Sequence, residues 1–265
     1  MPLPPLDTRG LGPVARLRAL VLERLIAANE RRAQAALERI PAVADAIRRY
    51  QARSEVTGMS WSDYLTLYRE IRRYGPREVL ELGSGVSTVV LAHALVANAA
   101  DGSPPGRITS MEEDLGWHHK AMACFPRELA HLVDYVHSPK VDGYYKIFRG
   151  VEYASIPERP YDYVFSDGPE RHSLVNGDKL FDLDLIQIVR RSDRPIRAMV
   201  DNHYLTFYVL QKVFGTELAR YSPTRRLMLV GPVTRNDVRH LRKENFVPDL
   251  RLIGRTELKL RMARD

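Results

Sequence analysis

Short glycine-rich or acidic segments directly follow four apolar runs of this chain. They are Gly83-Ser84-Gly85 after 78–82, Glu112-Glu113-Asp114 after 107–111, Asp167-Gly168-Pro169 after 161–166, and Asp201-Asn202-His203 after 196–200. Glycine permits positive φ and lets the backbone approach a ligand closely. A carboxylate at a strand end can bind both hydroxyls of a ribose. These residue types indicate a ribose-containing cofactor.

The elements that must position these segments alternate between strand and helix. Alternation at this spacing predicts an α/β fold, a doubly wound and mostly parallel seven-stranded sheet covered on both faces. Ligands bind at the carboxyl ends of the strands in such sheets, so the four segments are expected at one edge. The predicted strands are 78–82, 107–111, 132–137, 161–166, 196–200, 227–230 and 250–253, and the predicted helices are 87–97, 114–125, 181–190 and 204–214.

Residues 1–58 are predicted to form an N-terminal helical extension, and residues 59–265 the domain that carries the site. Apolar residues recur at spacings of three and four between positions 14 and 40, with arginines between them, and a second short helix is expected to end near Ile47. A basic amphipathic helix of this kind can lie on a membrane or pack on a partner, but a cap on the domain or a homodimer contact is the preferred interpretation. Ser60 or Ser62 is expected to cap the next helix.

Two cofactors fit a glycine turn followed by a ribose-binding carboxylate, a dinucleotide and S-adenosylmethionine (SAM). The dinucleotide fingerprint requires a third small residue where Thr88 stands. SAM has no pyrophosphate and carries a sulfonium cation, so Glu81, two residues before Gly83, suits SAM better. A NAD-dependent oxidoreductase therefore remains only as an alternative.

The segments EVLELGSGVST, ITSMEED and YDYVFSDGP resemble motifs of class I SAM-dependent methyltransferases. The resemblance implies a Rossmann-like methyltransferase fold and a SAM site at the first strand end. It implies that Glu112, or the adjacent Glu113, binds the ribose and that Trp117, His137 and Ser138 lie near the adenine. The remaining cofactor-binding residues that it implies are Glu81, Gly83, Ser84, Gly85, Ser87, Thr88 and Asp167.

A narrower resemblance concerns the metal-dependent O-methyltransferases of the catechol type. It implies that Asp167, Asp201 and Asn202 could hold Mg²⁺. This chain departs from that pattern three residues after Asp167, where a lysine is expected and Glu170 stands. Asp167, Glu170 and His172 are therefore the predicted catalytic residues. A plain turn at 167–169 and a helix cap at 201–202 would explain the same residues without a metal.

Composition leaves the methyl acceptor open. The chain has 265 residues, a net charge of +7 and one cysteine, Cys124, and no apolar run of the roughly 18 residues that a membrane span needs. A cytoplasmic enzyme without a secretory signal is expected. The predicted function is O-methylation of a small-molecule hydroxyl, phenolic or sugar. An RNA methyltransferase, suggested by the positive charge, and a non-catalytic scaffold are the alternatives. The loop 139–159 is expected to cover the site.

Overall fold

The computed structural model describes residues 9–10, 12–54 and 58–240. Its main sheet has seven strands in the order β3-β2-β1-β6-β8-β10-β9. The first five of these strands run parallel, and β10 pairs antiparallel with both of its neighbours. This confirms the expected mostly parallel, Rossmann-like sheet. The strands are β1 (Glu78–Leu82), β2 (Arg107–Glu112), β3 (Val133–His137), β6 (Tyr163–Ser166), β8 (Ile196–Val200), β9 (Ala219–Ser222) and β10 (Leu227–Val233).

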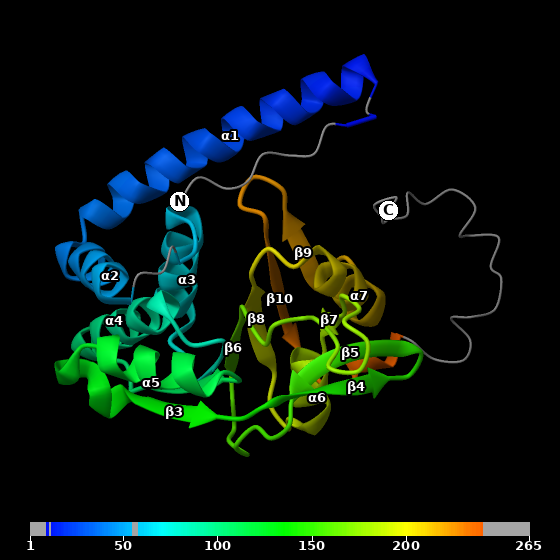
Figure 1. Ribbon diagram of the computed structural model, residues 1–265. Coiled ribbons are helices and arrows are strands. Elements are labelled where there is room, and N and C mark those ends of the chain that lie inside the picture. The colour runs from blue at the N-terminus through cyan, green and yellow to red at the C-terminus, as the bar shows by residue number, and fades with distance from the viewer. Residues whose placement is uncertain (1–8, 11, 55–57, 241–265) are drawn as a thin grey trace.

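Helices cover both faces of the sheet (Figure 1). Successive strand residues serve opposite faces, so Tyr163 and Phe165 join one apolar cluster while Val164 joins the other. The first cluster is closed by α1 (Pro13–Glu38), α2 (Pro41–Ser54), α3 (Trp61–Tyr74), α4 (Val86–Ala100), α5 (Leu115–Cys124) and η1 (Arg127–Leu132). The second is closed by α6 (Asp184–Arg191), α7 (Tyr204–Phe214) and η2 (Asp237–His240).

The expectation of a covering loop at 139–159 is wrong. The segment forms a hairpin of β4 (Lys140–Tyr145) and β5 (Phe148–Tyr153), and β5 pairs with β7 (Phe181–Asp182) in a second, three-stranded sheet. β4 contains one buried apolar side chain, Tyr145, so the segment lacks the apolar run by which the other strands were predicted. The predicted helix 181–190 accordingly begins later, at Asp184.

The predicted position of the seventh strand is also wrong. The structure uses Ala219–Ser222, which the sequence analysis did not identify, and the predicted strand 250–253 lies outside the described residues. β9 has four residues, of which only Ala219 is buried, so it lacks the apolar run on which that analysis relied. The second N-terminal helix is longer than expected and reaches Ser54.

The N-terminal helices pack into the same apolar cluster as the sheet, because Leu37 and Ile47 are fully buried beside Leu91. Ser60 caps α3 as expected, accepting a hydrogen bond from the Asp63 backbone N–H while the Asp63 carboxylate accepts one from the Ser60 N–H. This reciprocal cap fixes the start of α3 against the sheet. None of the helices in the described ranges is long and apolar enough to cross a bilayer.

Candidate active site

A cavity of about 640 Å³ opens at the carboxyl ends of β1, β2, β6 and β8, the edge predicted for the site. This volume is within the range of small-molecule pockets. The cavity brings together segments that are far apart in the chain. Its described lining residues are Gly58, Met59, Tyr64, Gly83, Ser84, Gly85, Val86, Ser87, Glu112, Glu113, Trp117, Asp167, Gly168, Pro169, Glu170, Arg171 and His203.

The two glycines of the loop after β1 differ in backbone conformation and in structural role. Gly83 has φ of 95°, and a Cβ there would come within 2.9 Å of the Gly168 backbone nitrogen. Gly85 has φ of 175°, which is extended backbone, and a Cβ there would meet nothing within 4 Å. The expectation of positive φ thus holds at Gly83 and fails at Gly85. Gly83 lets the loops after β1 and β6 touch, whereas Gly85 leaves room on the cavity wall.

Glu81 lies beneath this loop and is not among the lining residues. Its side chain is fully buried, and its Oε2 accepts hydrogen bonds of 2.6 Å from both Thr88 Oγ1 and Ser110 Oγ. Thr88 Oγ1 in turn accepts a hydrogen bond from the Gly85 N–H at 3.1 Å. Burial raises the pKa of Glu81 to about 7. Glu81 and Thr88 therefore stabilise the conformation of this loop through hydrogen bonds.

Glu112, at the end of β2, lies in the cavity wall and is 5 % exposed. Its Oε2 accepts hydrogen bonds from the Ser84 N–H at 3.2 Å and the Ser84 hydroxyl at 2.9 Å. Its Oε1 accepts from the backbone N–H groups of Glu113 and Asp114. Burial and then the neighbouring Glu113 raise its pKa to about 7. Glu112 joins the ends of β1 and β2 and presents a fixed carboxylate to the cavity.

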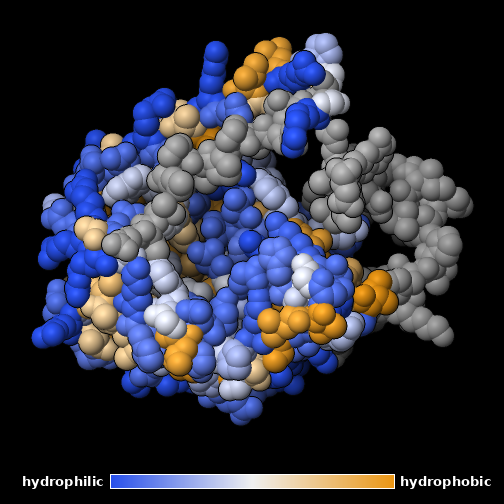
Figure 2. Space-filling model, viewed as in Figure 1, coloured by the Kyte–Doolittle hydropathy of each residue, from blue (hydrophilic) through white to orange (hydrophobic). Residues whose placement is uncertain are grey.

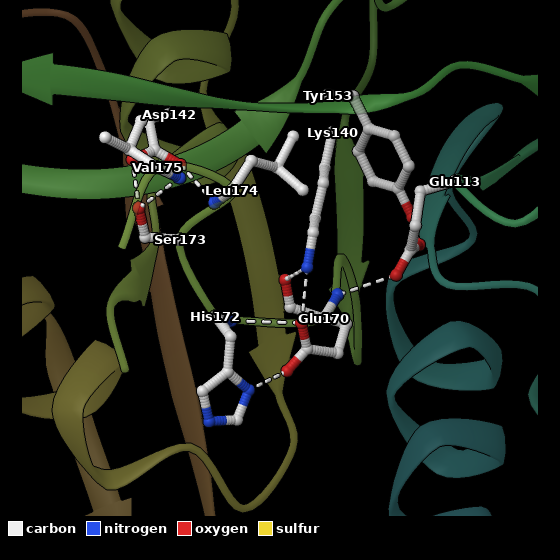
Figure 3. A network of polar contacts seen from close by, with 9 residues as sticks. All are labelled: Glu113, Lys140, Asp142, Tyr153, Glu170, His172, Ser173, Leu174 and Val175. Atoms are coloured by element: carbon white, nitrogen blue, oxygen red, sulfur yellow. Dashed lines mark hydrogen bonds and ion pairs between the residues drawn. The ribbon is translucent and has the colours of Figure 1, made fainter. Parts of the chain in front are cut away.

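Glu113 connects the β2 end to the loop after β6 (Figure 3). Its Oε1 accepts a 2.7 Å hydrogen bond from the Glu170 N–H, and its Oε2 accepts one of 3.2 Å from the Tyr153 hydroxyl. Tyr153 belongs to the hairpin strand β5, so a single carboxylate ties three elements together. The hairpin thus fixes the loop after β6 instead of covering the site.

Glu170 is held by Lys140 and His172, two of the partners drawn in Figure 3. Partial burial would raise the pKa of Glu170, but hydrogen bonds from Lys140 and His172 outweigh this and lower it to about 2. A carboxylate with so low a pKa is a weak general base. His172 is more than half exposed and is not among the lining residues. The predicted catalytic pair therefore forms an ion-pair network at the cavity rim.

Asp167 and Asp201 lie side by side on the paired strand ends of β6 and β8. Desolvation in the cavity wall, and then the Asp201 charge, raise the pKa of Asp167 above its ordinary value, although its side chain is 38 % exposed. Burial also raises the pKa of Asp201 to about 6, although a side-chain hydrogen bond with Asp167 opposes this. Asn202 follows Asp201 directly, and its Oδ1 atom is buried without a hydrogen-bond partner. The structure thus places the two predicted aspartate ligands side by side, but neither Asp201 nor Asn202 is among the residues that line the cavity.

Two cavity residues were missed by the sequence analysis. His203 is 6 % exposed, its Nε2 lies 3.7 Å from Asp167 Oδ1, and its Nδ1 is buried without a partner. Arg171 also lines the cavity, where burial lowers its pKa and the carboxylates of Asp167 and Asp182 oppose that effect. His203 ends the fourth predicted segment and Arg171 lies two residues after the third, so their positions were a signal that could have been used.

A buried pair of carboxyl groups behind the wall was also missed. Asp182 accepts hydrogen bonds from the Ser166 hydroxyl and, at 2.8 Å, from the Asp184 N–H, and Asp184 accepts from the Tyr153 N–H. Burial raises the pKa of both groups, that of Asp182 to about 6. The pair anchors β5 and the start of α6 to the end of β6. Two aspartates within the apolar run FDLDLI were the available signal.

The residues predicted near the adenine separate into two groups. Trp117 lines the cavity and donates a 2.9 Å hydrogen bond from Nε1 to the Ser84 carbonyl. His137 and Ser138 are not lining residues. His118 is buried against the Tyr135 ring on β3 because α5 packs on that strand. Among the described residues, no group of three His, Cys, Asp or Glu side chains is arranged to bind a metal.

Comparison with models of protein families and with curated proteins finds no match. Among solved structures, an O-methyltransferase from Bacillus cereus in complex with SAH is 17 % identical, with TM-score 0.41, over 75 % of this chain and 76 % of that one. A methyltransferase from Geobacter sulfurreducens is 14 % identical, with TM-score 0.44, over 71 % and 87 %. SAH-bound PaMTH1 from Podospora anserina is 12 % identical, with TM-score 0.40, over 81 % and 77 %. Likenesses this weak identify neither a family nor a substrate.

Proposed function

We propose that this chain is a SAM-dependent methyltransferase that methylates a hydroxyl group of a small molecule. The observation that carries the proposal is the joint placement of the Gly83–Gly85 loop and the Glu112 carboxylate in one cavity at the carboxyl ends of a Rossmann-like sheet. The loop gives close backbone approach to the methionine part of SAM. Glu112 is placed to accept hydrogen bonds from the ribose hydroxyls.

The charge of the cavity supports SAM over a dinucleotide. Four acidic residues line it, Glu112, Glu113, Asp167 and Glu170, against one arginine, Arg171, and Glu170 with its lowered pKa is ionised at neutral pH. A sulfonium and an α-ammonium group are attracted to such a wall, whereas a pyrophosphate is repelled. The same charge disfavours a phosphate-rich acceptor such as RNA at this cavity.

Asp167 and His203 support an oxygen acceptor. Both line the cavity, and both carry atoms that can accept a hydrogen bond from an acceptor hydroxyl. Methyl transfer needs the acceptor oxygen in line with the methyl carbon and the sulfur, and alignment of two bound reactants supplies much of the rate enhancement. In this mechanism the chain aligns donor and acceptor and stabilises the hydroxyl as it loses its proton.

We infer in addition that Asp167, Asp201 and Asn202 fit a divalent cation. Two adjacent carboxyl groups with raised pKa values and a buried, unpartnered amide oxygen form a hard oxygen donor set. A metal bound there would lower the pKa of a hydroxyl that coordinates it. Isothermal titration with Mn²⁺ tests this inference, since wild type should bind the ion and Asp201→Asn should not. Equal heats from both proteins would refute it.

The test of the main proposal is calorimetric titration of SAM and SAH into wild type and Glu112→Ala. We expect micromolar binding to wild type and a loss of roughly tenfold to a hundredfold in the variant, about 1.5–3 kcal/mol for hydrogen bonds to a charged group. Glu128→Ala, an exposed carboxylate on η1, serves as the control and should bind like wild type. No binding to wild type would overturn the proposal and favour the scaffold alternative, whereas binding of NADH alone would favour an oxidoreductase.

A further inference from the structure

The outer half of α1 exposes bulky aliphatic side chains to solvent. Val14, Leu17, Val21 and Leu25, here named the outer stripe, are 66 %, 63 %, 49 % and 51 % exposed. Their spacings of three and four residues place them on one side of the helix. The α1 residues that pack on the body, Ile26, Ala33 and Leu37, lie on another side and mostly further along the helix. The helix thus has two apolar faces, of which the described part of the chain covers one.

This exposure is concentrated on a part of the helix that extends beyond the body (Figure 1). Figure 2 shows apolar side chains beside strongly hydrophilic ones at the outer end of α1, at the top of the view. Isolated exposed aliphatic residues are common, but a continuous row on one element marks an interaction surface. We therefore expect the outer stripe to bind a partner.

The charges beside the outer stripe identify what kind of partner fits. Arg18, Arg24 and Arg32 are exposed, and at about 100° per residue they lie on the same side of the helix as the stripe or border it. Of the nearby carboxylates, Glu30 faces away and accepts hydrogen bonds from the backbone N–H groups of Trp61 and Ser62. The stripe is consequently surrounded by positive charge.

A second copy of α1 is a poor match for this surface. Two helices packed antiparallel about Val21 would bring position 18 of each copy beside position 24 of the other, and both positions are arginine. Like charges that face each other disfavour such a pair. A negatively charged surface that also accepts apolar side chains satisfies both features.

We propose that the outer half of α1 binds the surface of an anionic membrane. Helices that lie in the membrane interface insert apolar residues among the acyl chains and place arginines at the level of the headgroups. Val14, Leu17, Val21 and Leu25 would insert, and Arg18, Arg24 and Arg32 would contact lipid phosphates and carboxylates. The inference does not depend on the proposed methyl transfer, because its residues are remote from those that line the cavity.

Co-sedimentation with vesicles tests this inference on the full chain. Wild type should bind vesicles that contain phosphatidylserine, should not bind vesicles of phosphatidylcholine alone, and should dissociate as salt is added. The double variant Leu17→Glu, Val21→Glu should lose binding by about tenfold or more. Ile147→Glu, which changes an equally exposed aliphatic residue on the β4–β5 turn, is the matched control and should bind like wild type. Arg18→Gln with Arg24→Gln should weaken binding and reduce its salt dependence.

Three outcomes would overturn the inference. One is wild type that binds neither kind of vesicle. Another is a double variant that binds as well as wild type, which would place the contact elsewhere on this basic chain. The third is a doubled mass in light scattering that the double variant abolishes, without vesicle binding, which would show that a second copy covers the outer stripe. Unchanged far-UV circular dichroism of the variants, expected because these side chains are exposed, separates each outcome from misfolding.

Discussion

Replacing Gly83 by alanine should destabilise the fold, and the same change at Gly85 should not. At Gly83 an alanine would need φ near 95° and would place its Cβ 2.9 Å from Gly168 N and 3.2 Å from the Asp167 carbonyl carbon. Both contacts are to backbone, so no side chain can move aside. Backbone strain of about 1–3 kcal/mol and a further cost of about 1–3 kcal/mol for the close contact give roughly 2–6 kcal/mol.

The assay is urea and thermal unfolding of the two variants and wild type. For a chain of this size the expected loss at Gly83 lowers Tm by roughly 5–15 °C. Gly85→Ala should unfold within about 0.5 kcal/mol of wild type, yet bind SAM more weakly because its methyl group enters the cavity wall. Equal destabilisation by the two changes would refute the reasoning, as would a Gly83→Ala protein as stable as wild type.

Three further predictions concern groups around the cavity. The folded state holds the Glu81 proton more tightly than the unfolded state, because burial raises the pKa of Glu81 from 4.5 to about 7. The free energy of unfolding should therefore fall as the pH rises from 5 to 8. In urea titrations at each pH, Glu81→Gln should remove up to about 3 kcal/mol of that fall. An unchanged pH slope would show that Glu81 does not titrate in this range. Ser60→Ala should cost about 1 kcal/mol by calorimetry through loss of the α3 cap, whereas a neutral change would mean that Asp63 alone suffices. Glu170→Gln should raise amide exchange over residues 168–173 only severalfold and leave Tm unchanged, since ion pairs at the surface, such as that with Lys140, contribute about 0–1 kcal/mol. A lower Tm would show that this ion pair stabilises the fold by more than that.

The order of strands and helices could be predicted where each element buries a continuous apolar run. The runs that became β1, β6 and β8 are covered on both faces, so nearly all their residues are buried and most are apolar, which makes the signal strong. The hairpin strand β4 is covered on one face only, and β9 at the sheet edge has just four residues. Elements of this kind take their stability from pairing with distant strands, which local composition does not reveal.

The site could be predicted as an edge of the sheet but not as a set of contacts. Parallel strands place their carboxyl ends together, so the grouping of Gly83, Glu112, Asp167 and Asp201 followed from the predicted topology. Sequence does not show that Lys140 would reach Glu170 from thirty residues away and lower its pKa. Nor does it show which strand-end residue faces inward, and so His203 was missed while His172 was chosen.

The role that the structure gives Thr88 bears on the choice between cofactors. In a dinucleotide site the third small residue lets the helix pack closely on the strand. Here Thr88 is fully buried and its hydroxyl joins the Glu81 carboxylate to the Gly85 N–H. That N–H therefore points at a protein side chain and is not available to a phosphate oxygen. Negative charge on Glu81 below the loop and on Glu112 beside it opposes a pyrophosphate wherever these groups are ionised, which supports our proposal that the loop binds a cationic ligand.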